Sequence, residues 1–246
     1  KGQMMIDDSI PRAIIQRDKK SYAIVPKIPV GIITPEQLDR ISAVAKKYDI
    51  PAIKITSGQR IALVGIEEDK LEDIWHELDM PRGQVKPGER SLHYVQACPG
   101  IAACKYGVQD AIGMGQEMDT VFSDINLPAK VKVGISGCSF SCGESMVRDI
   151  GLLGKKSGWS LVIGGNAARR PRIGDIVAER LSKEQVIALT QRFLDFYCLH
   201  GKEKERTARF CERIGLEKIQ QAILNEDERL NHSGSSSKNH SDNHAN

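Results

Sequence analysis

Apolar positions along the first third of the chain follow a helical period in some segments and favour strands in others. The capping box Thr34-Pro35-Glu36-Gln37, with proline at the first helical position, precedes apolar residues at helical spacing. We therefore expect a helix from there to Tyr48. Runs rich in β-branched residues predict strands at 21–28, 50–56 and 60–65, and a second helix is expected at 69–78. Pro26 and Pro29 place the first of these strands at a sheet edge.

A proline- and glycine-rich stretch at 81–88 marks a linker. Beyond it we expect a helix over 102–114, strands over 130–136 and 159–163, a helix after the capping box at 182–185, and a last helical stretch to about 224. The end of the chain is rich in serine, asparagine, histidine and aspartate, which is typical of disorder. The pattern predicts an α+β protein with domains at 1–85 and 86–224 and a disordered tail at 225–246.

Composition narrows the classes of partner. The 246 residues suffice for one large or two small domains, and 40% hydrophobic with 27% charged residues is ordinary for a globular protein. Aromatic residues are only 5% and the net charge is +3, so we expect no nucleic-acid partner. No apolar run approaches the roughly 18 residues that a membrane span needs, so we expect no membrane partner. Reduced cysteine chemistry indicates a cytoplasmic protein.

Four cysteines in two pairs suggest the chemistry. Five residues separate Cys98 from Cys104, and three separate Cys138 from Cys142. Four thiolates are the usual ligands of a [4Fe–4S] cluster, whereas structural zinc sites favour tighter spacing in both halves. A disulfide framework is not expected in a chain of this size without a mark of secretion. The spacing favours an iron–sulfur cluster and leaves zinc as the alternative.

These motifs resemble those of the sulfite and nitrite reductase family, in its small single-repeat form. Further matches are Gly-Leu-Leu-Gly-Lys at 151–155, Gly-Gly-Asn at 164–166 and the N-terminal stretch 53–59, so the resemblance covers about residues 20 to 200. It implies a ferredoxin-like half-domain followed by an α/β domain that binds siroheme and a [4Fe–4S] cluster. It also implies reduction of sulfite to sulfide, or of nitrite to ammonia, with electrons from an external donor such as a ferredoxin or a flavoprotein.

The resemblance also assigns the cofactors to residues of this chain. The implied cluster ligands are Cys98, Cys104, Cys138 and Cys142. Cys142 is also the implied bridge from the cluster to the siroheme iron. Siroheme is ringed with carboxylates, so its pocket must be basic, and glycines permit a close approach of the backbone. The residues expected around siroheme are Gly164, Gly165, Asn166, Arg169, Arg170, Lys54 and Arg60, whereas Arg172 is as well explained by a solvated loop.

Lys130 and Lys132 are the implied residues of the substrate-anion pocket, with Arg90 upstream of the first cysteine pair. In a strand the two lysines share one face. Sulfite and nitrite lose oxygen as water, so positive charge and proton donors are needed together. An arginine suits a bidentate grip on an oxyanion. Without the resemblance, the lysines are also explained as solvated residues at a sheet edge.

The chain departs from the family pattern in the N-terminal domain. Two arginines of that pattern are missing, because the stretch 23–27 offers only Lys27 and the stretch 56–59 reads Thr-Ser-Gly-Gln. The substrate therefore stays open between sulfite and nitrite. The alternative function is an iron–sulfur electron-transfer or redox-sensing protein of the same fold without siroheme.

Many members of the family carry two repeats in one chain, which are related by an approximate two-fold axis, and only one of the repeats keeps the cluster. This chain has one repeat. A homodimer would place Lys130 and Lys132 of one chain over the siroheme of the other. The two remaining cysteines, Cys198 and Cys211, lie on predicted helices and are expected to be buried structural thiols.

Overall fold

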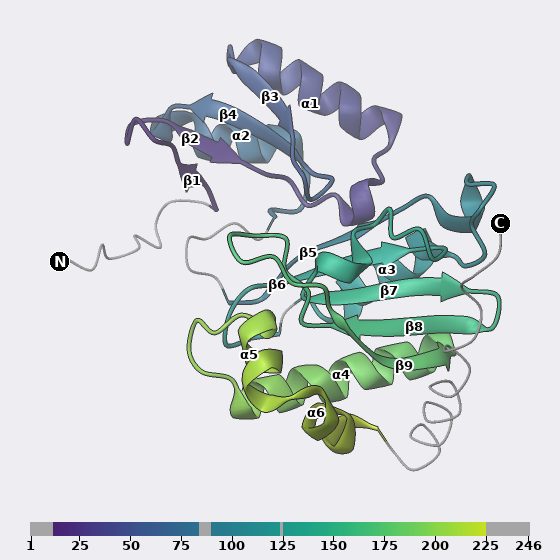
Figure 1. Ribbon diagram of the computed structural model, residues 1–246. Coiled ribbons are helices and arrows are strands. Elements are labelled where there is room, and N and C mark those ends of the chain that lie inside the picture. The colour runs from purple at the N-terminus through teal and green to yellow at the C-terminus, as the bar shows by residue number, and fades with distance from the viewer. Residues whose placement is uncertain (1–11, 84–89, 124, 225–246) are drawn as a thin grey trace. The chain divides into compact units, whose positions relative to one another are not determined.

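The chain forms two compact units that divide between residues 89 and 90 (Figure 1). The computed structural model describes residues 12–83, 90–123 and 125–224. Most of the predicted linker and the whole of the predicted tail lie outside these described residues. None of the helices in the described ranges has the length and apolar character that crossing a bilayer requires.

The N-terminal unit is an antiparallel four-stranded sheet in the order β1-β2-β4-β3. Helices α1 and α2 pack together, and the buried core includes Ile24, Ile41 and Leu63. The predicted capping box is confirmed: the Thr34 hydroxyl accepts a hydrogen bond from Gln37 N at 3.2 Å, and the Gln37 side chain accepts one from Thr34 N at 3.0 Å. The elements are β1 (Ile14–Ile15), β2 (Tyr22–Ile24), η1 (Pro29–Gly31), α1 (Pro35–Lys47), β3 (Ala52–Ile55), β4 (Ile61–Ile66), η2 (Glu68–Lys70) and α2 (Leu71–Leu78).

The prediction that the strand at 21–28 lies at an edge is wrong, because β2 pairs with β1 on one side and with β4 on the other. The strand ends at Ile24, before either proline. Pro26 forms only an isolated bridge with Arg82, and Lys27 N donates to Pro81 O at 2.8 Å. The prolines therefore end the strand and do not limit its pairing.

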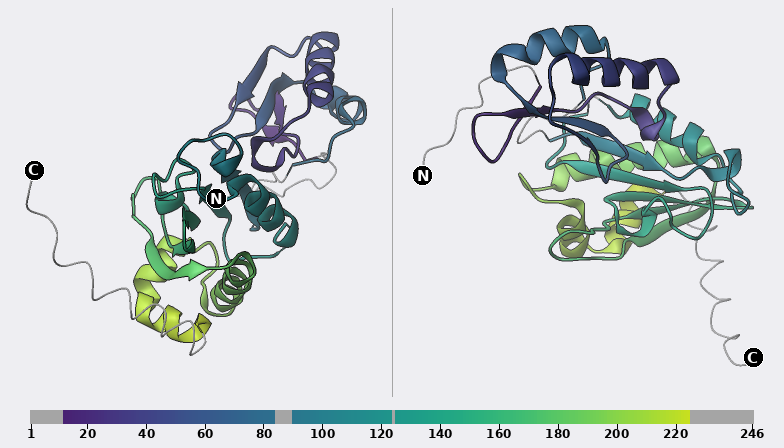
Figure 2. Two further views of the ribbon diagram at one scale, coloured as in Figure 1. Left: turned by 90° about the vertical axis from the view of Figure 1, so that its right-hand side faces the viewer. Right: turned by 90° about the horizontal axis from the view of Figure 1, so that it is seen from above.

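The C-terminal unit contains a five-stranded sheet in the order β5-β6-β7-β8-β9. Strands β5, β6 and β7 are parallel, and β7, β8 and β9 are antiparallel. Helix α3 packs on β5 and β6, α4 packs on β8 and β9, and α6 packs on β9 (Figure 2). The elements are β5 (Leu92–Ala97), η3 (Gly100–Ala102), α3 (Ala111–Val121), β6 (Val131–Ser136), η4 (Ser145–Val147), β7 (Ile150–Lys155), β8 (Gly158–Ile163), β9 (Asp175–Leu181), α4 (Lys183–His200), α5 (Thr207–Ile214) and α6 (Leu216–Ile223).

The helix predicted over 102–114 is wrong at its start, since α3 begins only at Ala111. The preceding backbone N–H groups are used elsewhere: Val108 N and Gln109 N donate to Gly137 O at 2.8 and 3.1 Å. Asp110 then caps the helix by accepting from Gly113 N at 2.9 Å. Residues 103–110 thus form a loop against the second cysteine motif.

Helix α4 buries the expected apolar face, and Phe193 and Tyr197 on it pack against Phe210 of α5. The prediction of two buried structural thiols holds for Cys211, whose pKa burial raises to about 12. It is wrong for Cys198, which is exposed on α4. Its thiol donates to Asn126 O at 3.4 Å, on the outward side of the helix.

Candidate functional site

Parallel pairing of β5 and β6 brings the two cysteine motifs to one edge of the sheet. Ala97 at the end of β5 pairs with Ile135 near the end of β6. Cys98 follows β5 directly, and its N–H donates to Ile135 O at 3.0 Å. Cys138 lies two residues beyond the end of β6. The carboxyl ends of two neighbouring parallel strands therefore present the first cysteine of each pair.

Glycines let the two cysteine loops touch. Gly137 N donates to the Cys98 sulfur at 3.1 Å, a bond that stabilises a thiolate. A Cβ on Gly137 would lie 2.6 Å from Gly100 Cα, so only glycine fits there. On the outer side Tyr106 and Phe140, one from each loop, meet edge to face with ring centroids 5.2 Å apart. The loops form one joined structure.

The four thiols differ in exposure. Cys98 is buried, Cys104 and Cys138 are half-buried, and Cys142 is exposed. Within the described ranges, no three His, Cys, Asp or Glu side chains lie close enough together for one metal ion. The thiols are thus distributed over two joined loops and do not converge on one point. The exposed thiol of Cys142, in the same loop as the exposed Phe140, fits a residue that must reach a second cofactor.

The predicted substrate cations lie at the opposite end of the same strands. Lys130 directly precedes β6, and Lys132 is its second residue. Cys138 follows Lys132 by six positions, which is roughly 20 Å of extended chain. Arg90 precedes β5 at that same end and forms an ion pair with Glu203 at 3.3 Å. The loop of the second cysteine pair nevertheless reaches back along the sheet: Glu144, two residues after Cys142, forms an ion pair with Arg148, which lies against the same Tyr94 ring as Lys132.

Lys132 has an unusual environment for a lysine. Its ammonium lies 5.5 Å from the ring centroid of Tyr94, and the guanidinium of the buried Arg148 lies 5.6 Å from the same ring. Its ammonium finds no hydrogen-bond acceptor among the described residues. Burial lowers the pKa of Lys132, and the positive charges of Arg206, Arg148 and Lys130 lower it further.

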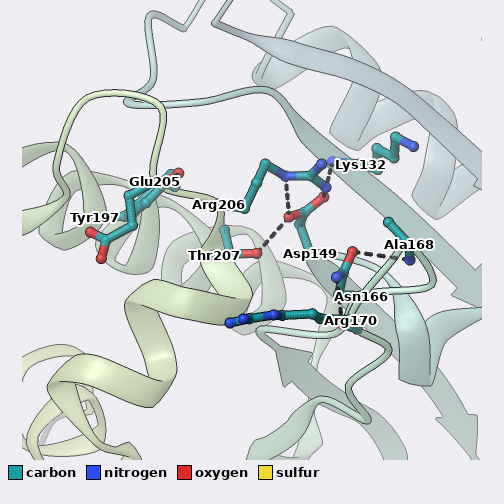
Figure 3. A network of polar contacts seen from close by, with 9 residues as sticks. All are labelled: Lys132, Asp149, Asn166, Ala168, Arg170, Tyr197, Glu205, Arg206 and Thr207. Carbon is teal, nitrogen blue, oxygen red and sulfur yellow. Dashed lines mark hydrogen bonds and ion pairs between the residues drawn. The ribbon is translucent and has the colours of Figure 1, made fainter.

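A fully buried carboxylate organises the neighbourhood of Lys132. Asp149, 1% exposed, accepts from Lys132 N at 2.9 Å and from the Thr207 hydroxyl at 2.6 Å. It also accepts from Arg206 through Nε at 3.1 Å and through Nη2. Figure 3 shows this carboxylate between Arg206 and Thr207, with the Lys132 side chain running away from it. The network ties the start of β6 and the start of α5 to the residue before β7.

The glycines expected near siroheme lie against the same segment. Gly164 N donates to Asp149 O at 2.9 Å, and a Cβ on Gly165 would lie 2.5 Å from Arg148 O. The Asn166 amide donates to Arg170 O at 2.7 Å and holds the following loop in shape (Figure 3). Within that loop the side chains of Arg169 and Arg170 are exposed.

Arg172 has a structural role. Its guanidinium donates to Gly164 O at 3.0 Å and to Asp175 at 2.6 Å, and Glu212 lies 3.6 Å away. These contacts close the loop over the glycines. Lys54, exposed on β3, and Arg60, half-buried before β4, belong to the N-terminal unit. Their part in a siroheme site stays a prediction.

Three residues at this site could not be identified from the sequence. Arg148, Asp149 and Arg206 surround Lys132, yet Asp149 and Arg206 are 57 residues apart. An ion pair between residues so far apart in the sequence leaves no local motif by which it could be predicted. The one available hint was the composition of the segment Arg148-Asp149 just before a predicted family motif at 151–155.

Two family models match the chain, and each covers one of its two compact units. The family model described as "Nitrite and sulphite reductase 4Fe-4S domain" matches residues 89–233. The model described as "Nitrite/Sulfite reductase ferredoxin-like half domain" matches residues 14–81. The predicted α+β fold, with a ferredoxin-like half-domain followed by a cluster-binding domain, is confirmed.

Among curated proteins, the "Sulfite reductase, assimilatory-type" of Nitratidesulfovibrio vulgaris strain Hildenborough is 48% identical over 219 residues, which is 89% of this chain and 100% of that protein. The "Nitrite reductase [NAD(P)H]" of Bacillus subtilis strain 168 is 36% identical over 88% of this chain and 26% of its own length. Among solved structures, dissimilatory sulfite reductase I aligns with a TM-score of 0.72 at 15% identity, over 85% of this chain and 71% of that one. The chain belongs to the nitrite and sulphite reductase family.

Proposed function

We propose that this protein is a siroheme–[4Fe–4S] oxidoreductase that reduces sulfite to sulfide, with nitrite to ammonia as a second reaction. The main support is the pair of joined cysteine loops in a chain of this family, in which one thiol is exposed. Cys98, Cys104, Cys138 and Cys142 would hold the cluster, and Cys142 would also reach the siroheme iron. When bound, siroheme supplies an iron that holds the anion, and the cluster supplies electrons.

The residues of this chain have two further tasks in that reaction. Exposed Arg169 and Arg170 follow the glycines and are suited to pair with siroheme carboxylates. Lys130 and Lys132 would hold the anion by charge and donate protons, because each oxygen leaves as water and needs two of them. Arg90 already forms an ion pair with Glu203, so we expect it to contribute less than the two lysines to binding of the substrate anion.

Electrons would come from an external donor such as a ferredoxin or a flavoprotein. The donor delivers them to the cluster, so no nucleotide site in this chain is needed for the reaction. The cysteines of the chain are free thiols, which agrees with a reducing compartment, and we place the protein in the cytoplasm.

Turnover tests this function directly. Holoprotein prepared without oxygen should oxidise reduced viologen when sulfite is added and should release sulfide; nitrite is the second substrate to try. Siroheme bound without turnover of either anion would contradict the proposed enzyme. Extraction that yields iron and sulfide but no tetrapyrrole would favour the alternative, an electron-transfer or redox-sensing protein.

The lowered pKa of Lys132 predicts the pH dependence of that turnover. An ordinary lysine loses its proton near pH 10.4, about the value of the free side chain. Because the folded protein lowers the pKa of Lys132, its proton should be lost at a lower pH, and kcat/KM for sulfite should fall there. Lys132→Arg, which keeps its charge, should move this alkaline limb upward. Identical pH profiles for the two proteins would show that Lys132 does not donate the proton.

We further propose a homodimer with shared sites. In a two-fold dimer, Lys130 and Lys132 of one chain would hold the anion over the siroheme of the second chain. The N-terminal sheet also has an edge strand, β3, with Ile53 and Ile55 exposed at 49% and 78%. Such an edge favours pairing with another chain.

Mixing two inactive variants tests the shared site. Cys142→Ser lacks the bridging thiol, and Lys132→Met lacks the cation that holds the substrate anion. A mixed dimer would contain one intact site, so refolding an equal mixture should restore about a quarter of wild-type sulfite reduction. Mass spectrometry can confirm that mixed dimers formed. A mixture that contains mixed dimers and stays inactive would rule out the shared site.

A further inference from the structure

Positive charge exceeds negative charge where β6 begins. The four cations Lys130, Lys132, Arg148 and Arg206 lie in one electrostatic cluster. The carboxylates within it are Asp149 and Glu144, and each already forms an ion pair, with Arg206 and Arg148 respectively.

The cations have unused donors. The buried Arg148 Nε has no hydrogen-bond partner among the described residues, although a buried donor normally has one. The Lys132 ammonium and Arg206 Nη1 likewise find no acceptor within the described ranges. Unused donors on clustered cations are typical of an anion site.

Asp149 fixes the position of Arg206. It accepts from two guanidinium nitrogens, while Thr207 and the Lys132 backbone N–H hold the carboxylate from other directions. The Arg206 side chain stays 28% exposed, so its remaining nitrogen faces outward from the pair. Arg206 is therefore a pre-positioned charge beside Lys132, and it directly precedes α5 in the C-terminal unit.

We propose that Arg206, held by Asp149, is a specificity residue that makes the anion site at Lys132 prefer a doubly charged oxyanion such as sulfite over a singly charged one such as nitrite. The inference rests on the proposed function. Arg206 acts through its charge on the anion at Lys132, and Asp149 is the positioning residue.

The charges of the two anions determine how much loss of the Arg206 charge should change KM for each of them. The Coulomb energy of a dianion near a given cation is twice that of a monoanion. If loss of the Arg206 charge raises KM for sulfite about tenfold, the KM for nitrite should therefore rise only about threefold. The ratio of the two effects separates a charge-selecting role from general damage to the site.

The test compares wild type with Arg206→Gln, Arg206→Lys and the matched control Arg209→Gln, which removes an exposed arginine of the same helix. KM and kcat for sulfite and nitrite are measured at mildly alkaline pH with reduced viologen. We expect Arg206→Gln to lower the sulfite preference about threefold, Arg206→Lys to restore most of it, and Arg209→Gln to leave it unchanged. Equal losses for both anions, or the same shift in Arg209→Gln, would overturn the inference.

A second measurement needs no turnover and separates this inference from the proposed function. Sulfate, which is divalent, should raise the Tm of wild type and of Arg209→Gln more than that of Arg206→Gln at equal ionic strength, because it binds the folded cluster. Arg209→Gln also reports the general stabilising effect of sulfate. Equal shifts in all three proteins would overturn the anion site. A wild type that reduces neither anion would refute the proposed function, and the Tm shifts would still decide this inference.

Discussion

Replacing Cys142 by serine should lower sulfite reduction more than about 100-fold. Loss of a residue that only supports a metal ligand costs up to about 100-fold, and Cys142 is proposed as a ligand and as the bridge between two cofactors. Among the described residues, the exposed thiol of Cys142 forms no hydrogen bond that a serine would disturb, so the fold of the joined loops should survive. Iron, acid-labile sulfide, extracted tetrapyrrole and turnover are measured on the same preparation.

Cys198→Ser is the control, because Cys198 is the other exposed cysteine and lies on α4, away from both cysteine loops. It should keep full cofactor content and full turnover. A Cys142→Ser protein that reduces sulfite at the wild-type rate would contradict the bridging role, even if the cluster content stayed complete.

Replacing Asp149 by asparagine should lower the free energy of unfolding by about 3 kcal/mol. Breaking a buried ion pair costs about 3–5 kcal/mol, and the partial exposure of Arg206 places this pair at the lower end. Asparagine keeps the volume, so the loss reports charge and hydrogen bonds. Denaturant unfolding of the protein, followed by a probe of the C-terminal unit, gives the value.

Glu117→Gln removes the partner of Lys183, an ion pair whose side chains are 35% and 51% exposed. This substitution should lower the free energy of unfolding by at most about 1 kcal/mol, because exposed ion pairs contribute little to stability. If Asp149→Asn were no more costly than this control, the Asp149 network would not organise the start of β6, and Arg206 would lack the fixed position assigned to it.

The cysteine loops could be located from the sequence because the two cysteines of each pair lie close together along the chain. Spacing and glycines identify Cys98 and Gly137, and β6 was predicted from its β-branched residues. The pairing of the loops required the sheet, since parallel strands align Ala97 with Ile135. The same strands place Lys132 near the start of β6, and only the ion pair of Glu144 with Arg148 shows that the second cysteine loop folds back toward it.

Other parts of the fold had no readable signal. Strand β9 (Asp175–Leu181) contains alanine, glutamate, arginine and leucine, which favour a helix, and becomes a strand because it pairs with β8. Loop 103–110 falls in a stretch predicted to be helical, but the N–H groups of Val108 and Gln109 donate to Gly137 O. In both segments a contact distant in sequence overrides local propensity. The Asp149–Arg206 pair has the same origin.

The proposed function requires the joined cysteine loops to hold a [4Fe–4S] cluster linked to siroheme. The decisive measurement is an absorption spectrum of anaerobically prepared protein, recorded before and after addition of sulfite. We expect siroheme bands together with cluster absorption, and a shift of the siroheme bands when sulfite binds. A spectrum with cluster absorption alone, unchanged by sulfite in protein supplied with siroheme, would contradict the proposed function.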